Sequence, residues 1–536
     1  MENVFDFRNT LIDEYSAFSR SFTRIKAQDL WAEVEKVYNE GRYWPEPLIQ
    51  INPNYQRKDT VQSLVVQGLL HKDCADIFKV GKVEGNAGPL QLYTHQIEAI
   101  AKAREKKSYV VTTGTGSGKS LAFFIPIVDN ILKAKEIDPT PRTRAIVIYP
   151  MNALANSQME ELNKFLYGYA DNKKPFTVSR YTGQEKKIFR EQIAQNPPDI
   201  LLTNFMMLEL ILTRYDPIDR PVVEHCHNLK YLVLDELHTY RGRQGADVAM
   251  LVRRLRQRLD AKELICIGTS ATMSSTGSME DQQQTVAEVA SKLFGTSISS
   301  HEVIGETPER VTDLHLDISN VKPQLAPRIH TKPFEWSDFS EFKKDPLSVW
   351  VELCLGIDMS NLSKPRRARP LSLSEAAQRL ATDAGMEFAI ARDALKSFLN
   401  AALTIQTPQG FSPFAFKLHQ FISGPGKLYS TLEPEGLRHI TLDAQRFAPG
   451  RQAEGVMLYA THFCRECGQE YHPVWEKTGS VSQYIPREID DIASEDDEVH
   501  FGFLAPRKPE QQYQGKLEDL PEVWIDLTRT DVNHHG

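Results

Sequence analysis

Residues 109–120 read YVVTTGTGSGKS, and this stretch decides the fold of the central part of the chain. The β-branched run Tyr109–Thr112 predicts a buried strand, the glycines predict a tight loop, and the apolar stretch from Leu121 predicts a helix. A glycine-rich loop between a strand and a helix N-terminus turns backbone N–H groups toward phosphate oxygens. The stretch therefore predicts a nucleotide-binding loop in an α/β domain.

The individual positions of this loop have distinct expected roles. Lys119 is expected to reach the β- and γ-phosphates, and the Ser120 hydroxyl is expected to help hold Mg²⁺. The general pattern G-x-x-x-x-G-K-[ST] begins with glycine where this chain has Thr113, but the end of the pattern is intact. The remaining residues expected to line the phosphates are Thr115, Gly116, Ser117 and Gly118.

Short apolar runs alternate with helical patterns throughout residues 83–300. Near-continuous apolar runs are typical of strands that are buried on both faces of a parallel sheet. Alternation with helices predicts a doubly wound α/β fold. The further runs are 145–149, 200–203, 231–234 and 264–268.

The rest of the chain divides into accessory regions. With 536 residues and ~150 residues per domain, we expect about three or four domains. Residues 1–82 form an N-terminal accessory region, residues 301–400 a helical accessory region, and residues 401–536 a strand-rich region with an acidic run at 488–498. The basic stretch 364–370 is interpreted as a solvated hinge, with a phosphate contact as the alternative.

Composition limits the classes of function. The chain carries 63 Lys+Arg against 71 Asp+Glu, a net charge of −8, so a surface that binds a polyanion must be local. The six cysteines are scattered apart from Cys464 and Cys467, which suits a reducing cytoplasm. No targeting or membrane-spanning segment is expected, since the longest apolar stretch, 121–132, is interrupted and too short.

An acidic motif follows the run 231–234. Asp235 and Glu236 at a strand end face the crevice where open α/β sheets bind ligands. Asp235 is expected to hold Mg²⁺, and Glu236 to orient or deprotonate the attacking water. His238 is expected to couple the nucleotide state to the rest of the domain, together with Ser270 and Thr272 after the next run.

The sequences TGTGSGKS, DELH and SAT, in this order, resemble motifs I, II and III of superfamily 2 helicases of the DEAD/DEAH-box type. The resemblance covers about residues 90–275 and implies one RecA-like ATPase lobe that uses ATP and Mg²⁺. Gln96 resembles the adenine-reading glutamine of that family. The resemblance also implies sequence-independent contacts to one nucleic-acid strand at Pro150, Asn152, Thr182, Gly183, Thr203 and Asn204.

The flanking regions narrow the resemblance. Residues 5–8 with Arg20 and Arg24, then 419–423 and 463–471, resemble the large bacterial antiphage-defence helicases of the DISARM DrmA and Druantia DruE type. This resemblance favours DNA as the nucleic acid, while the residues themselves leave the choice between DNA and RNA open.

The pair Cys464 and Cys467 has the spacing of one zinc knuckle. A structural zinc needs four ligands, and the chain has no second C-x-x-C. Either His462 or His472 or residues outside the chain complete a site, or the pair is two reduced thiols in a turn. Both interpretations stay open at this point.

A motor of this family has two RecA-like lobes, and arginines of the second lobe complete the ATP site. The nearest match to the second-lobe signature, 445–451, has the wrong Gln-to-Gly spacing. We therefore expect a helicase or translocase lobe that needs a second lobe from missing sequence or a partner chain, with weak ATPase activity when alone. An ATP-gated DNA clamp or scaffold without strand separation is the alternative.

Overall fold

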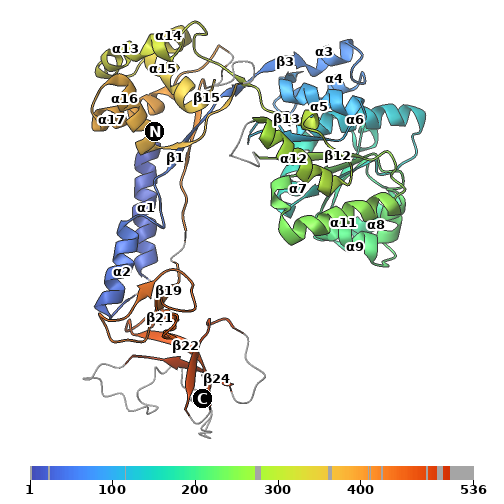
Figure 1. The fold of residues 1–536 in the computed structure, drawn as a ribbon. Helices are drawn as coiled ribbons and strands as arrows, with labels where there is room; N and C mark the ends of the chain where they lie inside the picture. Colours follow the sequence, from blue (N-terminus) through green and yellow to red (C-terminus); the bar gives the residue numbers. More distant parts are fainter. Residues whose placement is uncertain are drawn as a thin grey trace.

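A computed structural model describes residues 3–21, 24–114, 116–271, 279–359, 365–408, 410, 412–423, 426–478, 481–491 and 499–506. Three bodies are visible in it: an α/β domain on the right of Figure 1, a helical body at upper left and a small sheet below. The long helices α1 (Val4–Ser21) and α2 (Gln28–Asn39) run between the helical body and the small sheet. Among the described residues, no helix is both long and apolar enough to cross a bilayer.

The α/β domain is built on a seven-stranded sheet with the order β13-β7-β12-β11-β8-β10-β9. Every pairing in this sheet is parallel, which confirms the predicted α/β fold class. The strands are β7 (Tyr109–Thr112), β8 (Ala145–Tyr149), β9 (Val178–Tyr181), β10 (Ile200–Asn204), β11 (Tyr231–Leu234), β12 (Ile265–Ser270) and β13 (Val303–Gly305).

Helices cover both faces of this sheet. Along β7, Tyr109 and Val111 belong to one core cluster and Val110 to the other, as the period of two requires. Because both clusters are closed by helices, the strands are apolar at successive positions. The helices are α5 (Thr94–Arg104), α6 (Leu121–Ile137), α7 (Asn152–Phe165), α8 (Lys187–Gln195), α9 (Phe205–Thr213), α10 (Asp219–Glu224), α11 (Gly242–Arg258) and α12 (Met279–Phe294), with short turns η1 (Asp171–Lys173), η2 (Leu237–Thr239) and η3 (Ser300–Glu302).

The packed α/β unit extends beyond residues 83–300 at both ends. Residues of α3 (Val61–Val66) and α4 (Cys74–Ile77) lie in the same core cluster as α6. The strand β3 (Arg57–Thr60) pairs with β6 (Gln91–Tyr93), and β13 joins the sheet beyond residue 300. A further small pair joins β4 (Lys79–Val80) to β5 (Gly88–Pro89).

The helical body has its own core, which includes Trp350 and Phe398. Its five helices are α13 (Ile318–His330), α14 (Phe339–Lys344), α15 (Pro346–Val351), α16 (Leu373–Ala384) and α17 (Phe388–Ala402), and a π-helical turn, η4 (Glu352–Gly356), follows α15. The strand β1 (Leu48–Asn52) lies antiparallel between β17 (Leu371–Ser372) and β18 (Ala415–His419), so this part of the N-terminal region belongs to the helical body. Two short pairs lie near it: β2 (Asn54–Tyr55) with β14 (Pro308–Glu309), and β15 (Ile357–Asp358) with β16 (Arg366–Arg367).

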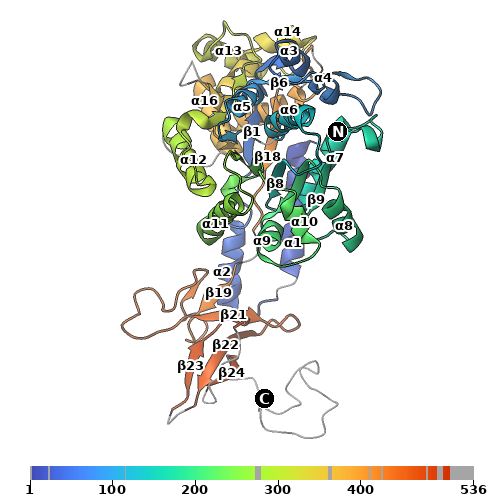
Figure 2. The ribbon, with the colours of Figure 1, turned by 90° about the vertical axis from the view of Figure 1, so that its right-hand side faces the viewer.

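The small sheet is antiparallel and holds the strand-rich C-terminal region. Its strands are β19 (Leu428–Ser430), β20 (Ile440–Thr441), β21 (Tyr459–Phe463), β22 (Glu470–Lys477), β23 (Gln483–Pro486) and β24 (Val499–Leu504). Phe5 of α1 lies in the core of the helical body, and Leu30 of α2 packs with Leu428 of β19. The two N-terminal helices therefore connect these bodies, as both Figure 1 and Figure 2 show.

Candidate nucleotide and nucleic-acid site

The predicted site residues lie at the carboxyl ends of the parallel strands. Following the sheet order, the phosphate loop follows β7, Ser270 ends β12, and Asp235 follows β11. Beyond them, Pro150 follows β8, Asn204 ends β10, and Thr182 follows β9. One edge of the sheet thus carries the predicted nucleotide residues on one half and the predicted strand-binding residues on the other.

The phosphate loop is held in shape by its own hydroxyl groups and glycines. Thr113 Oγ1 and Ser117 Oγ are 2.6 Å apart and fully buried, which gives Thr113 a structural reason to replace glycine. Gly116 and Gly118 have φ angles of +82° and +67°, which residues with a Cβ rarely adopt. Ser120 is the N-cap of α6 and its side chain does not cap that helix, so the hydroxyl can face a ligand. The predicted phosphate residue Thr115 lies outside the described residues.

Two buried side chains of α5 hold the loop from below. Gln96 Nε2 donates to the Gly118 carbonyl at 2.9 Å, while its Oε1 accepts from the Tyr93 N–H at 2.9 Å. His95 Nε2 lies 2.9 Å from the Ser117 carbonyl, and burial lowers the pKa of His95 to about 4. The neutral ring must therefore donate this bond from Nε2. The structure gives Gln96 a contact to the phosphate loop, and its role in reading adenine stays a prediction.

The acidic motif meets the phosphate lysine. Lys119 Nζ lies 3.4 Å from Glu236 Oε1, and both side chains are mostly buried. The Thr269 hydroxyl donates to Asp235 Oδ1 and accepts from the Glu236 N–H at 3.1 Å. Burial raises the pKa of Asp235 above its ordinary value, although the hydrogen bond from Thr269 opposes this rise. Thr269 directly precedes the predicted Ser270. The sequence did not indicate a role for Thr269, because only the residues after it match the motif Ser-Ala-Thr.

Glu236 has a left-handed backbone, with φ 52° and ψ 57°. Such a conformation costs about 1–3 kcal/mol for a residue with a side chain and is typical of functional sites. Its Oε2 is buried without a hydrogen bond to a described residue, while His238 Nδ1 lies 3.3 Å away. His238 Nδ1 is also 3.4 Å from Ser270 Oγ, so the predicted coupling pair is in contact. Thr272, the third predicted coupling residue, lies outside the described part of the chain.

This arrangement fits a magnesium nucleotide. A buried carboxylate, an acidic oxygen that accepts no hydrogen bond from a described residue, and a lysine meet beside a glycine-rich loop at a helix N-terminus. A cavity of about 700 Å³ adjoins the loop at Gly116 and is lined by Tyr93 and Arg57 of the lobe. Residues of the helical accessory region, including Arg310 and Lys343, line its other side. The cavity is therefore shared between the α/β domain and the accessory region.

The predicted strand-binding residues form a second cluster. Asn204 is the N-cap of α9, and its Oδ1 accepts from the Met207 N–H at 2.7 Å. Asn204 Nδ2 donates to Asn152 Oδ1 at 2.7 Å and to the Thr182 carbonyl at 3.0 Å. One asparagine thus joins the loops after three strands. Pro150, half-buried directly after β8, belongs to the same edge.

Two predicted contacts in this cluster are used internally. Thr203 is fully buried, and its hydroxyl donates to the Tyr181 carbonyl at 2.6 Å. This hydroxyl therefore supports the loops and does not face a nucleic-acid strand. The Thr182 and Gly183 N–H groups donate to Glu185 Oε2 at 2.7 and 3.0 Å. These two amides hold an anionic group of the chain itself, and a contact of Thr182 or Gly183 to nucleic acid stays a prediction.

One arginine of the predicted basic hinge lies at the phosphate loop. Arg367 Nη2 lies 3.1 Å from Glu306 Oε2, and the same carboxylate oxygen accepts from the Gly114 N–H at 2.8 Å. The Arg367 side chain is only 13% exposed, so the interpretation of 364–370 as a solvated hinge is wrong for this residue. Arg367 lies more than 200 positions from the loop in the sequence, and no sequence pattern indicated this contact.

The cysteine pair does not form a metal centre within the described residues, where no cluster of three His, Cys, Asp or Glu groups exists. His462 and His472 are on β21 and β22 and are not gathered with Cys464 and Cys467. Backbone N–H groups of Cys467 and then Glu466 lower the pKa of Cys464, as in a tight thiolate turn. Among the described residues, the structure thus supplies two thiols and gathers no further ligands around them.

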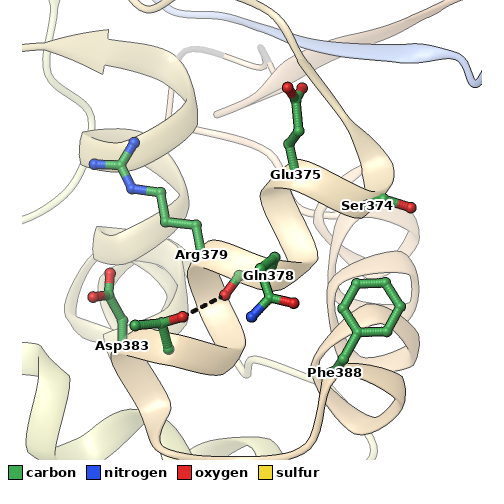
Figure 3. Close-up of a pocket in the computed structure, with 7 residues that line it drawn as sticks. Ser374, Glu375, Gln378, Arg379, Asp383 and Phe388 are labelled. Atoms are coloured by element: carbon green, nitrogen blue, oxygen red, sulfur yellow. Dashed lines mark hydrogen bonds between the residues drawn. The ribbon is translucent and has the colours of Figure 1, made fainter.

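Another cavity lies far from these residues, in the helical body. Figure 3 shows it on α16 and the start of α17, with a volume of about 620 Å³. Its polar groups hold the fold: Arg379 donates to the Cys354 carbonyl at 3.0 Å, and Asp383 accepts from Trp350 Nε1 at 2.8 Å. We therefore assign no function to this cavity.

Comparison with known proteins adds a family to this geometry. Residues 93–280 match the DEAD/DEAH box helicase family. The uncharacterised ATP-dependent helicase YprA of Bacillus subtilis (strain 168) is 34% identical over 194 residues, which are 36% of this chain and 24% of YprA. Druantia protein DruE of Escherichia coli (strain UMEA 4076-1) is 27% identical over 345 residues, which are 44% of this chain and 18% of DruE.

The crystal structure of DUF1998 helicase MrfA bound to DNA is similar over 49% of this chain and 33% of that chain, with 24% identity and a TM-score of 0.35. The chain spans only 18% of DruE and 24% of YprA. The match to the family and the motif geometry coincide on the same parallel sheet. Residues 93–280 therefore resemble the DEAD/DEAH box helicase family both in sequence and in the placement of the motifs on the sheet.

Proposed function

We propose that this chain supplies the ATP-binding RecA-like lobe of a nucleic-acid-dependent helicase or translocase. One observation carries the proposal: the phosphate-loop lysine, the acidic strand end and the coupling pair meet at one half of a sheet edge whose other half bears the Asn204 cluster. This is the arrangement that linking ATP turnover to a bound strand requires.

In this proposal each residue of the nucleotide half has a separate task. Gly116, Gly118 and Ser117 turn the loop around the phosphates, and Lys119 neutralises their charge. Ser120 and Asp235 would hold Mg²⁺, which supplies charge stabilisation at the transferred phosphoryl group. Glu236 orients the attacking water or accepts its proton.

The strand-binding half is proposed to bind DNA. The similarity to Druantia protein DruE supports a role in bacterial phage defence, and DNA is the strand that such a role implies. Asn152, Pro150 and Asn204 are proposed to face its backbone, without reading its sequence. The buried free cysteines Cys74, Cys226, Cys266 and Cys354 suit a reducing cytoplasm, where we place the protein.

Turnover is proposed to need a second lobe, from further sequence or from a partner chain. An arginine supplied from outside the lobe contributes ~10³ to 10⁵ in the rate of phosphoryl transfer. The chain alone should therefore bind Mg·ATP and hydrolyse it slowly. Vigorous ATP hydrolysis by the purified chain, stimulated by DNA, would contradict this part of the proposal. Zinc is not included, because Cys464 and Cys467 offer only two ligands.

The strand-binding half is tested with Asn204→Ala. Losing three hydrogen bonds should loosen the loops and weaken single-stranded DNA binding by about tenfold, while ATP binding stays intact. Asn196→Ala, at an exposed helix end, is the matched control. Equal DNA affinity of both variants and the native chain would remove this surface from the proposal. A strand-displacement assay with the second lobe added separates a helicase from an ATP-gated clamp, which would bind DNA and separate nothing.

A further inference from the structure

An ion pair from the accessory region closes over the start of the phosphate loop. We call it the Arg367 bracket; it consists of the side chains of Arg367, Glu306 and Tyr55 with the Gly114 backbone. Arg367 Nη2 donates to Glu306 Oε2 at 3.1 Å and to the Tyr55 hydroxyl. Glu306 Oε2 also accepts from the Gly114 N–H at 2.8 Å. A single carboxylate oxygen thus joins the accessory arginine to the backbone of the loop.

The short strand pairs of the linking segments place these groups. Arg367 lies on β16, where it pairs with Ile357 of β15, next to the helical body. Glu306 directly follows β13 at the sheet edge, and Tyr55 pairs with Pro308 of β14. The bracket is therefore a junction between the accessory region and the nucleotide lobe.

The packing against Gly114 is close. A Cβ at this position would lie 2.2 Å from Arg367 Nη2 and 2.6 Å from Nη1, so only glycine lets the guanidinium rest on the loop. The Arg367 and Glu306 side chains are 13% and 15% exposed, which limits screening by solvent. Arg367 Nε is buried and has no hydrogen-bond partner among the described residues.

The charges of the bracket bear on polyphosphate binding. Glu306 places a negative charge beside an N–H group of the loop that is proposed to bind phosphate oxygens. Without Arg367, the Glu306 carboxylate would repel these oxygens. Arg367 cancels this charge where the two side chains are shielded from water. A charge this close to the loop is expected to alter polyphosphate affinity by about tenfold or more.

We propose that Arg367 is a positioning residue for the nucleotide, through which the accessory region sets the affinity of the phosphate loop by neutralising Glu306. The inference rests on the proposed function, because it assumes that the loop binds ATP. It goes beyond the motifs of the helicase domain, since Arg367 lies outside residues 93–280.

The test measures binding of a fluorescent ATP analogue with Mg²⁺ to the full chain. Arg367→Gln removes the charge and keeps an amide donor for Tyr55, and it should weaken binding by about tenfold or more. Arg367→Lys keeps the charge and should lose less, because only the forked geometry changes. Glu306→Gln should bind as tightly as the native chain or more tightly, since Gln can still accept from Gly114.

The double variant Arg367→Gln with Glu306→Gln separates electrostatics from packing. If Arg367 acts by neutralising Glu306, removing both charges should restore most of the lost affinity. A purely structural role predicts that the double variant is as weak as the single one or weaker. Arg366→Gln is the matched control, because Arg366 is the neighbour on β16, pairs with Asp358 and has a 45% exposed side chain.

Each outcome decides one statement. Unchanged binding by Arg367→Gln, or no recovery in the double variant, would overturn the inference. In that case, ATP binding by the native chain would still support the proposed function. Absence of binding by the native chain would overturn both. If Arg367→Gln does not fold, as judged by thermal unfolding without nucleotide, Glu306→Gln alone decides: a tenfold loss of affinity contradicts the inference, and equal or tighter binding supports it.

Discussion

Glu236 combines a left-handed backbone with a carboxylate oxygen that accepts no hydrogen bond from the part of the chain that the structure describes. The fold keeps both costs at one residue beside Lys119, which is the pattern expected of a group that acts on a ligand. The Glu236 carboxylate is therefore available to act on a ligand, because the described residues do not use both of its oxygens in hydrogen bonds.

The variant Glu236→Gln should keep nucleotide binding and lose turnover. Gln has the size of Glu but cannot accept a proton from water, so the basal hydrolysis rate should fall by about a hundredfold or more. Single-turnover hydrolysis and analogue binding, measured on the same samples, check this. Turnover at the native rate would show that Glu236 does not assist the attack.

His95 makes the stability of the lobe depend on pH. Burial lowers the pKa of His95 to about 4 from 6.5. Between these two pH values, His95 therefore binds a proton in the unfolded chain but not in the folded chain. The contribution of neutral His95 to the free energy of unfolding is fully present above pH 6.5. It is lost as the pH decreases toward 4, which lowers the free energy of unfolding by about 3 kcal/mol. His95→Gln should reduce this dependence.

The dependence is measured by thermal unfolding at pH 7 and pH 4.5. The exposed His301 in η3 provides the control variant His301→Gln, which should keep the native pH dependence. An unchanged difference between the two pH values in His95→Gln would mean that other groups cause it. His472, whose pKa burial also lowers to about 4, contributes a similar part in the C-terminal sheet.

At the scale of elements, the ends of β11 and β12 act as a unit. The Thr269 hydroxyl serves Asp235 and the Glu236 N–H at once, so it fixes the acidic motif to the neighbouring strand. The parallel pairing of β11 with β12 brings the two ends together. This link is what allows the coupling pair His238 and Ser270 to meet.

Thr269→Val should therefore disturb the acidic motif without changing the shape of the strand. It leaves a buried carboxylate oxygen and a backbone N–H unpaired, which should cost about 1–3 kcal/mol of stability and lower the rate of hydrolysis. Thr269→Ser should recover both, because it restores the hydroxyl. Thr285→Val, which removes an exposed hydroxyl on α12, is the control. If Thr269→Val matches this control, the hydroxyl has no role in the motif.

Elements with strong local signals were predictable from sequence. The strands β7, β8 and β11 lie at the predicted runs, because each is buried on both faces and apolar at every position except Thr112 at the end of β7. The edge strands β9 and β13 were not predicted. β9 is mostly half-buried and reads as polar, and β13 has only three residues. Edge position removes the very pattern that identifies a strand.

The site was predictable to the same degree. Lys119, Asp235 and Glu236 follow strands with clear patterns, so their meeting follows from parallel topology. Thr269 and Arg367 carry no motif, and only the folded contacts reveal them. The Thr203 hydroxyl donates to the Tyr181 carbonyl of a neighbouring strand, which sequence spacing does not show, and a contact of Thr203 to nucleic acid stays a prediction.

At the scale of the whole molecule, a buried ion network joins α2 to the small sheet. Arg438 is only 2% exposed and lies 2.6 Å from Asp29 Oδ1 and 3.4 Å from Glu470 Oε1. Burial alone would raise the pKa of Asp29, but hydrogen bonds from Arg438 and backbone N–H groups lower it to about 2. The N-terminal helices therefore hold the C-terminal sheet by charge as well as by the packing of Leu30 on Leu428.

Arg438→Met should release this sheet and leave the nucleotide lobe intact. Removing one member of a buried network leaves its carboxylates uncompensated and costs about 3–5 kcal/mol. Hydrogen exchange should rise in β22 and stay unchanged in β7 and β11. Arg446→Met, whose side chain lies over Phe447 in the same region, is a comparison variant. Unchanged exchange in β22 would show that the network does not hold the sheet.

The loop 113–120 is proposed to bind the nucleotide for the domain built on the parallel sheet. Titration of the purified chain with a fluorescent ATP analogue and Mg²⁺ tests this proposal most directly, with Lys119→Ala as the variant and Lys133→Ala, a surface lysine of α6, as the control. Saturable binding is expected from the native chain and from Lys133→Ala, and a loss of binding from Lys119→Ala. Equal binding by Lys119→Ala and the native chain would contradict the proposal.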